Sequence, residues 1–191
     1  MSAPSIPPQL AAIDREYDRL DRCVRDVLAA VPAPRWNVRA DPSAWSVAEC
    51  FAHLNLTSAA MVPRLRAVWP DARALGPAPA RYKAGIVGAI LSAMVGPMPR
   101  IGRFRIGRVR TPAAFIPQGA LPRDAIMREF AEWQAAERSL LREAAELPVD
   151  RVRIESPFAP GMFYDGYSSL RILVRHAHRH VEQAARVWRD A

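Results

Sequence analysis

Apolar residues recur at three- and four-residue spacing in four long segments of the chain, which is the spacing of one face of an α-helix. The first segment runs from Pro8 to Val31 and the second from Ser46 to about Pro70. The third runs from Pro122 to Leu147, and the fourth begins near Ser168 and reaches Trp188. Four long amphipathic helices predict an all-α fold, an up-down four-helix bundle whose sites are built from side chains on facing helices.

Capping residues and prolines set the expected ends of the second helix. Ser46 and Glu49 have the spacing of a capping box, so the helix should begin at Ser46. Proline cannot donate the next backbone hydrogen bond, so we expect a bend near Pro63 and an end by Pro70. Residues 149–164 are expected to connect the third and fourth helices.

An irregular insertion, residues 70–121, separates the second and third helices and is rich in proline and glycine. Within it, the apolar run from Gly85 to Met98 predicts a short helix near residues 81–97, too short to span a bilayer. Five arginines follow this run: Arg100, Arg103, Arg105, Arg108 and Arg110. A lid helix followed by a solvated basic loop is the favoured interpretation, and contact with an anionic membrane surface is the alternative.

The composition bounds the function only loosely. A chain of 191 residues, 50% of them hydrophobic, suits a single domain covering residues 1–191. The formal net charge of +8 raises the question of nucleic acid or membrane binding, but Lys83 is the only lysine, so arginine supplies almost all of the excess. Nucleic acid is disfavoured as a partner because Phe104 is the only aromatic residue among the arginines that follow the apolar run.

Neither cysteine use nor the N-terminus indicates export. Cys23 and Cys50 form no CxxC pair, and we expect both to be buried small hydrophobic residues. Residues 1–9 contain neither a basic start nor an apolar stretch, so no signal peptide is recognisable. A cytoplasmic location is therefore expected.

The histidines indicate a metal site. His176 and His180 are one helical turn apart on the apolar side of the fourth helix, so both imidazoles can reach one ion. His178 points the other way, and we interpret it as an exposed partner of Glu182.

A third inward candidate is His53 on the second helix, four residues after Glu49, which could orient its ring as a hydrogen-bond acceptor. Three neutral imidazoles on two facing helices would leave coordination positions open, as a catalytic metal requires. Hydrogen-bonded core packing is the alternative for each histidine taken alone.

Several motifs resemble those of a known family. The segment from Trp45 to Leu54 is similar to the second-helix motif of the DinB-like (DinB/YfiT-like) four-helix-bundle proteins. Residues 110–117, 156–158 and 176–183 resemble later motifs of the same family, in the same order. The resemblance covers most of the chain from Trp45 onward and implies a DinB-like bundle with an insertion between its second and third helices.

The resemblance also implies a divalent transition metal, most often zinc or nickel, bound by His53, His176 and His180. Some relatives are transferases or isomerases that use a low-molecular-weight thiol, so a metal-dependent thiol S-transferase acting on a small-molecule substrate is the leading hypothesis. Arg103 and Arg105 are candidate ligands for an acidic thiol or substrate. The alternative is a non-catalytic bundle that binds a metal or a small ligand, and a homodimer is compatible with either function.

Overall fold

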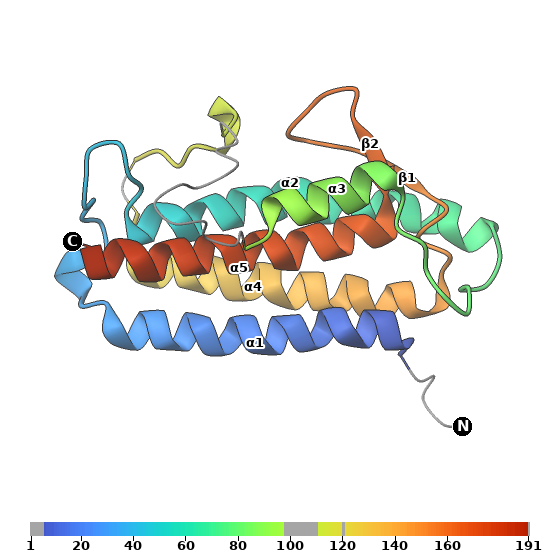
Figure 1. Cartoon of the computed structure of the whole chain (residues 1–191), viewed down its shortest axis with the longest axis horizontal. Helices are drawn as coiled ribbons and strands as arrows, with labels where there is room; N and C mark the ends of the chain where they lie inside the picture. Colours follow the sequence, from blue (N-terminus) through green and yellow to red (C-terminus); the bar gives the residue numbers. More distant parts are fainter. Residues whose placement is uncertain (1–5, 98–110, 120, 191) are drawn as a thin grey trace.

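A computed structural model describes residues 6–97, 111–119 and 121–190. Four long helices form the bundle (Figure 1): α1 (Pro8–Ala30), α2 (Val47–Ala74), α4 (Arg123–Glu143) and α5 (Gly166–Asp190). Apolar side chains along these helices are buried together, including Tyr17, Phe51 and Leu140. The predicted all-α bundle is therefore confirmed. Among the described residues, no helix combines the length and hydropathy needed to cross a bilayer.

Contacts between helices show the direction in which each one runs. The amide of Gln9 lies 3.4 Å from the Tyr167 hydroxyl, and His178 contacts the backbone of Glu16 further along, so α1 and α5 are parallel. Figure 1 shows both helices starting at the same end of the bundle.

The same reasoning places α2 and α4 in parallel. Asn55 donates to the carbonyl of Ile126, and Ser58, one turn later, donates to Glu137. The helices therefore run up, down, down, up, which refines the simple alternation expected from sequence. The reason is the long connection between α2 and α4, which returns along the bundle instead of making a tight turn.

The capping box at the start of α2 is present. The Glu49 backbone N–H donates to the Ser46 hydroxyl at 3.2 Å, and the Ser46 N–H donates to the Glu49 carboxylate at 2.8 Å. The predicted end at Pro70 is wrong, because α2 contains both Pro63 and Pro70 and continues to Ala74. Proline removes one intrahelical bond, and burial of Trp69 and Ala72 holds the last turn in place.

The insertion contains the expected short helix, α3 (Ile86–Val95), which packs along α5. Single 3₁₀ turns lie at Ala33–Arg35, Ala113–Phe115 and Ala144–Glu146. Arg103 and Arg105, the candidate anion ligands, lie outside the described residues.

A small hairpin occupies the segment expected to be only a connection. Strands β1 (Arg153–Glu155) and β2 (Phe163–Asp165) are antiparallel, with Ile154 opposite Tyr164. The hairpin leads directly into α5 and contacts α3. It therefore fixes where the histidine-bearing helix begins.

The two cysteines differ in their environments. Cys50 on α2 is buried, as expected. Cys23 is exposed on α1, so the prediction that it is a core residue is wrong. Its neighbour Val24 occupies the inward position instead, because adjacent helical residues differ by about 100° in direction.

Candidate metal centre

Three histidines from two antiparallel helices meet near one end of the bundle. His53 lies on α2, and His176 and His180 lie one turn apart on α5. One ring nitrogen from each lies within 4.8 Å of the others, and the Nε2 atoms of His53 and His176 are 3.4 Å apart. The structure thus brings together the three histidines that the sequence singled out.

The orientation of His53 is set by a backbone carbonyl. Its Nδ1–H donates to the carbonyl oxygen of Phe115 at 2.8 Å, which leaves the Nε2 lone pair directed at the other two rings. Phe115 belongs to the 3₁₀ turn at the end of the insertion, so this turn helps to build the site.

Glu49 does not have the role expected of it. Its carboxylate accepts from the guanidinium of Arg39, including the Nε–H at 2.9 Å, and from the backbone of Ser46. Helix capping directs this side chain toward the start of α2, away from the residue one turn later. Burial alone would raise the pKa of Glu49, but the hydrogen bonds from Arg39 and Ser46 and the charge of Arg39 together lower it below its usual value.

Trp45 forms one wall of the site and was not singled out as a site residue from the sequence. Its ring centroid lies 4.8 Å from that of His53 and 5.7 Å from that of His180, and it stacks on the latter. Its position immediately before the Ser46 cap is a signal in the sequence that could have placed this indole beside the first turns of α2.

Burial favours the neutral form of all three imidazoles. Burial lowers the pKa of His53, against an opposing effect of its bond to Phe115. Burial, followed by the nearby His53 ring, lowers the pKa of His176 to about 3. Burial and the two neighbouring rings place the pKa of His180 well below its usual value. Neutral imidazole is the form that binds a metal.

Comparison with known families identifies a match. A sequence profile of the DinB superfamily matches residues 11–184. The chain belongs to the DinB superfamily. The match includes all three clustered histidines and agrees with the resemblance found in the motifs. Comparison with curated proteins and with solved structures gives no significant match.

The donor set of this DinB-superfamily site fits a transition metal. Two imidazole nitrogens bound to a tetrahedral ion at about 2.0–2.1 Å lie about 3.4 Å apart, and the two Nε2 atoms of His53 and His176 are separated by 3.4 Å. The Nδ1 atom of His180 is buried without a hydrogen-bond partner among the described residues, so a ligand there would satisfy it. The three histidines could therefore hold a divalent metal.

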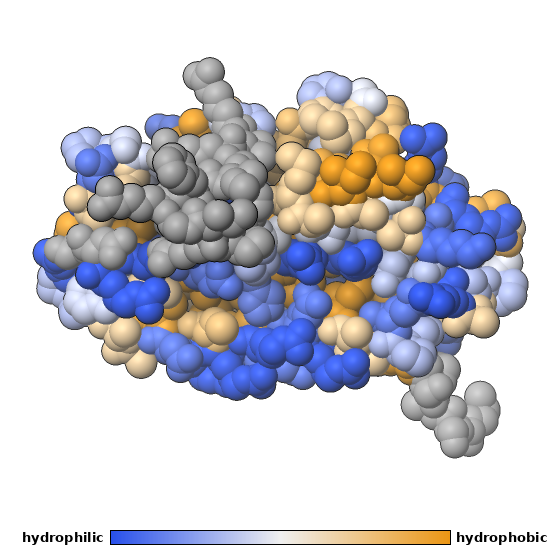
Figure 2. All heavy atoms as spheres, viewed as in Figure 1, coloured by the Kyte–Doolittle hydropathy of each residue, from blue (hydrophilic) through white to orange (hydrophobic). Residues whose placement is uncertain are grey.

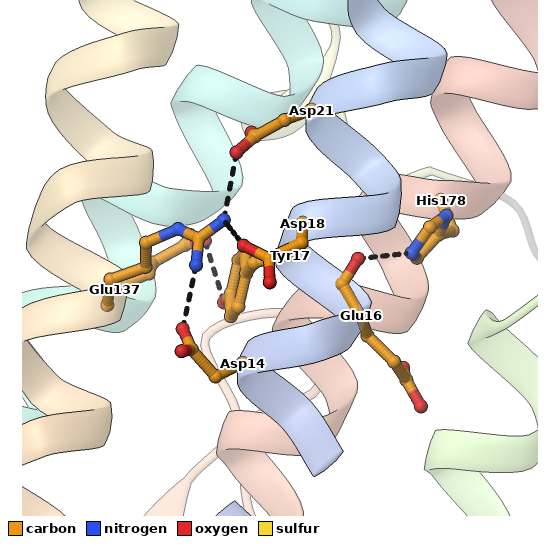
Figure 3. A network of polar contacts seen from close by, with 8 residues as sticks. Asp14, Glu16, Tyr17, Asp18, Asp21, Glu137 and His178 are labelled. Atoms are coloured by element: carbon orange, nitrogen blue, oxygen red, sulfur yellow. Dashed lines mark hydrogen bonds and ion pairs between the residues drawn. The ribbon is translucent and has the colours of Figure 1, made fainter. Parts of the chain in front are cut away.

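His178 lies outside this cluster. The prediction that it points away from the metal ligands agrees with the structure, but its expected partner, Glu182, is wrong. Its Nε2–H donates to the carbonyl of Glu16 on α1 at 2.9 Å (Figure 3), while Glu182 lies 4.0 Å from Arg186. Close packing of α1 against α5 makes the backbone acceptor available. His178 thus joins two helices of the DinB bundle.

Proposed function

We propose that this DinB-superfamily protein binds one zinc or nickel ion through His53, His176 and His180 and uses it to activate a low-molecular-weight thiol. The reaction would be the transfer of that thiol to a small electrophilic substrate, as in a thiol S-transferase.

The composition of the cluster carries the proposal. Among the described residues, the candidate ligand group consists of three imidazoles and includes neither a carboxylate nor a thiolate. Structural zinc sites have four protein ligands and are usually rich in cysteine, whereas catalytic sites have three and keep a position free for substrate. Three neutral ligands also leave the full charge of a divalent ion available to the substrate. The cluster therefore resembles a catalytic site more than a structural one.

A divalent ion in this position would lower the pKa of a thiol or a water molecule bound to it. The residues of the chain do the positioning. The Phe115 carbonyl fixes the tautomer of His53, and the Trp45 ring covers His53 and His180. As whole residues, His53 and His180 are buried, whereas His176 is partly exposed, so we place the approach of the substrate on the side of His176.

Metal content is the first test. Protein purified without a histidine tag should contain close to one zinc or nickel per chain by mass spectrometry. His53→Ala and His176→Ala should each lose the metal, whereas His178→Ala should keep it, because His178 lies on the same helix but bonds to Glu16. Wild-type protein that is metal-free and cannot be reloaded would refute the proposal.

Thiol activation needs a separate readout. Nickel- or cobalt-loaded protein should change its absorption when a low-molecular-weight thiol is added, because thiolate ligation alters the spectrum of these ions. A spectrum that no candidate thiol changes would favour the alternative function, a non-catalytic bundle that binds metal. The metal proposal and the thiol proposal can thus fail independently.

A further inference from the structure

The short helix α3 differs from a usual surface helix in the side chains that it buries and exposes. Its small residues face the protein: Gly88 and Ser92 are buried, and a Cβ added at Gly88 would lie 2.3 Å from the side chain of Ser168. Four of its large apolar residues face outward, including Ile86 at 80% and Ile90 at 55% exposed, whereas Leu91 and Val95 pack against the core. Surface helices normally place such residues inward.

The outward face of α3 forms a continuous hydrophobic surface with the hairpin. Figure 2 shows strongly hydrophobic residues gathered over α3. The exposed apolar side chains of this surface are Ile86, Val87, Ile90 and Met94 of α3 and Met162 and Phe163 of the hairpin. An exposed apolar patch of this kind marks an interaction site more often than a bare surface.

Cations surround this apolar surface. The helix itself carries no charge, and α5 beneath it contains no aspartate or glutamate from Gly166 to Val181. The cations that flank α3 lie just before it and along α5: Arg81, Lys83, Arg171, Arg175 and Arg179. Arg175 and Arg179 also donate to backbone carbonyls of α3. Two carboxylates contact the segment before α3, but Asp150 accepts from the backbone N–H of Lys83, and buried Asp165 accepts from that of Gly85. The five cations outnumber these two carboxylates and Glu16, which lies beside Arg171 and Arg175, so the rim has a net positive charge.

A wide-open surface cavity of about 570 Å³ lies beside this basic rim. Three of its lining side chains are the cations Arg81, Lys83 and Arg171. Contacts between residues fix the rest of the lining. The amide of Gln9 both donates to and accepts from the backbone of Tyr82. The Tyr82 ring stacks on Tyr167, with 5.3 Å between the ring centroids. The volume and charge suit an anionic head group.

We propose that the outward face of α3, together with this cavity, docks on the surface of an anionic lipid bilayer. The side chains of Ile86, Ile90 and Met94 would enter the boundary between head groups and acyl chains, and the basic rim would attract the lipid phosphates. This inference is independent of the metal chemistry proposed above.

Charge complementarity favours a bilayer over a second copy of the chain. A symmetric dimer through α3 would place the basic rims of the two copies against one another, with like-charge repulsion across the interface. An anionic bilayer offers both an apolar interior for the helix and negative charge for its rim. The combination of an uncharged apolar helix with flanking cations is typical of interfacial contact.

Vesicle cosedimentation tests the proposal. The full chain should bind vesicles that contain phosphatidylglycerol and should not bind vesicles of phosphatidylcholine alone. The double variant Ile86→Glu, Ile90→Glu should bind at least about tenfold more weakly. Leu56→Glu is the matched control, because Leu56 is an apolar residue 38% exposed on α2, and it should bind as the wild type does. Circular dichroism establishes that each variant is folded.

A second variant separates lipid from free anion. Lys83→Ala should weaken vesicle binding about fivefold, and higher salt should weaken it further. The proposal would be overturned in favour of a soluble anion ligand if millimolar-range glycerol phosphate released the protein and the protein did not distinguish between the two kinds of vesicle. Equal binding to both kinds of vesicle, or to neither, would also overturn it. So would a dimer in sedimentation that Ile90→Glu dissociates, because the surface would then be a protein interface.

Discussion

Glu137 is a buried carboxyl group between three helices, and its protonation should control the pH dependence of stability. It lies on α4 and is 3% exposed. The Tyr17 hydroxyl of α1 donates to it at 2.9 Å, and the Ser58 hydroxyl of α2 donates at 2.7 Å. Figure 3 shows Glu137 beside Tyr17. Burial is the largest influence and raises the pKa of Glu137 from 4.5 to about 7, against the opposing effect of the two hydrogen bonds.

The size of the effect follows from this pKa. Because the pKa is higher in the folded protein than in the unfolded chain, the contribution to stability is fully present below pH 4.5 and is lost as the pH rises through 7. Each unit of difference corresponds to about 1.4 kcal/mol, so the loss is roughly 3 kcal/mol by pH 8. Glu137→Gln is neutral at every pH and should show no such loss.

Urea unfolding of metal-free protein between pH 4.5 and pH 8, followed by circular dichroism, measures the effect. The difference in unfolding free energy between wild type and Glu137→Gln should move by roughly 3 kcal/mol in favour of the variant as pH rises. The clustered histidines are the same in both proteins, so their titration cancels. Glu132→Gln, exposed on the same helix, controls for the loss of a carboxylate. A difference that stays constant with pH would refute the reasoning.

Three other expectations follow from individual contacts. Arg138 pairs with three aspartates of α1 (Figure 3). Arg138→Met should therefore lower the unfolding free energy by roughly 1 kcal/mol at low salt and by less at high salt. An effect on the unfolding free energy that salt does not change would contradict this expectation. Gly88→Ala places a Cβ 2.3 Å from Ser168, so it should cost about 1–3 kcal/mol in denaturant unfolding and make α3 easier to cleave by protease; a neutral result would mean that α3 is not packed this closely. Zinc at about 100 times its dissociation constant should stabilise the wild type and His178→Ala by about 2.7 kcal/mol, as measured by thermal unfolding. It should not stabilise His180→Ala, and equal stabilisation of that variant would exclude His180 as a ligand.

The long helices were predictable from sequence because each buries one regular stripe of apolar residues. In α1, the stripe from Leu10 to Val27 is buried at every expected position. The end of α2 was not predictable, since burial of Trp69 and Ala72 outweighs the missing hydrogen bond at Pro70. The helix directions were not predictable either, because periodicity shows which face of a helix is buried but not which way the helix points.

The candidate site was only partly predictable, for a similar reason. His176 and His180 are related by helical spacing within one element, and His53 was found because it lies on an inward face. The partner of His53 is a backbone carbonyl, which every residue carries, so no residue type in the sequence marks Phe115 for that role. Glu49 has the right chemistry and spacing, but its carboxylate is already used by the cap of α2 and by Arg39.

One helix links the two proposals of function and docking. The inward face of α5 carries His176 and His180, and an arginine immediately precedes each of them. These two arginines bind α3. Arg175 donates to the Ser92 carbonyl at 2.8 Å, and Arg179 donates to the Met94 carbonyl at 2.9 Å. Because His180→Ala changes only the inward face, it should remove metal and leave vesicle binding intact. Because the substitution of Ile86 and Ile90 changes only the outward face, it should do the reverse. Loss of metal in that outward variant would instead show that the position of α3 is transmitted to the ligands, and these two arginines provide the direct connection.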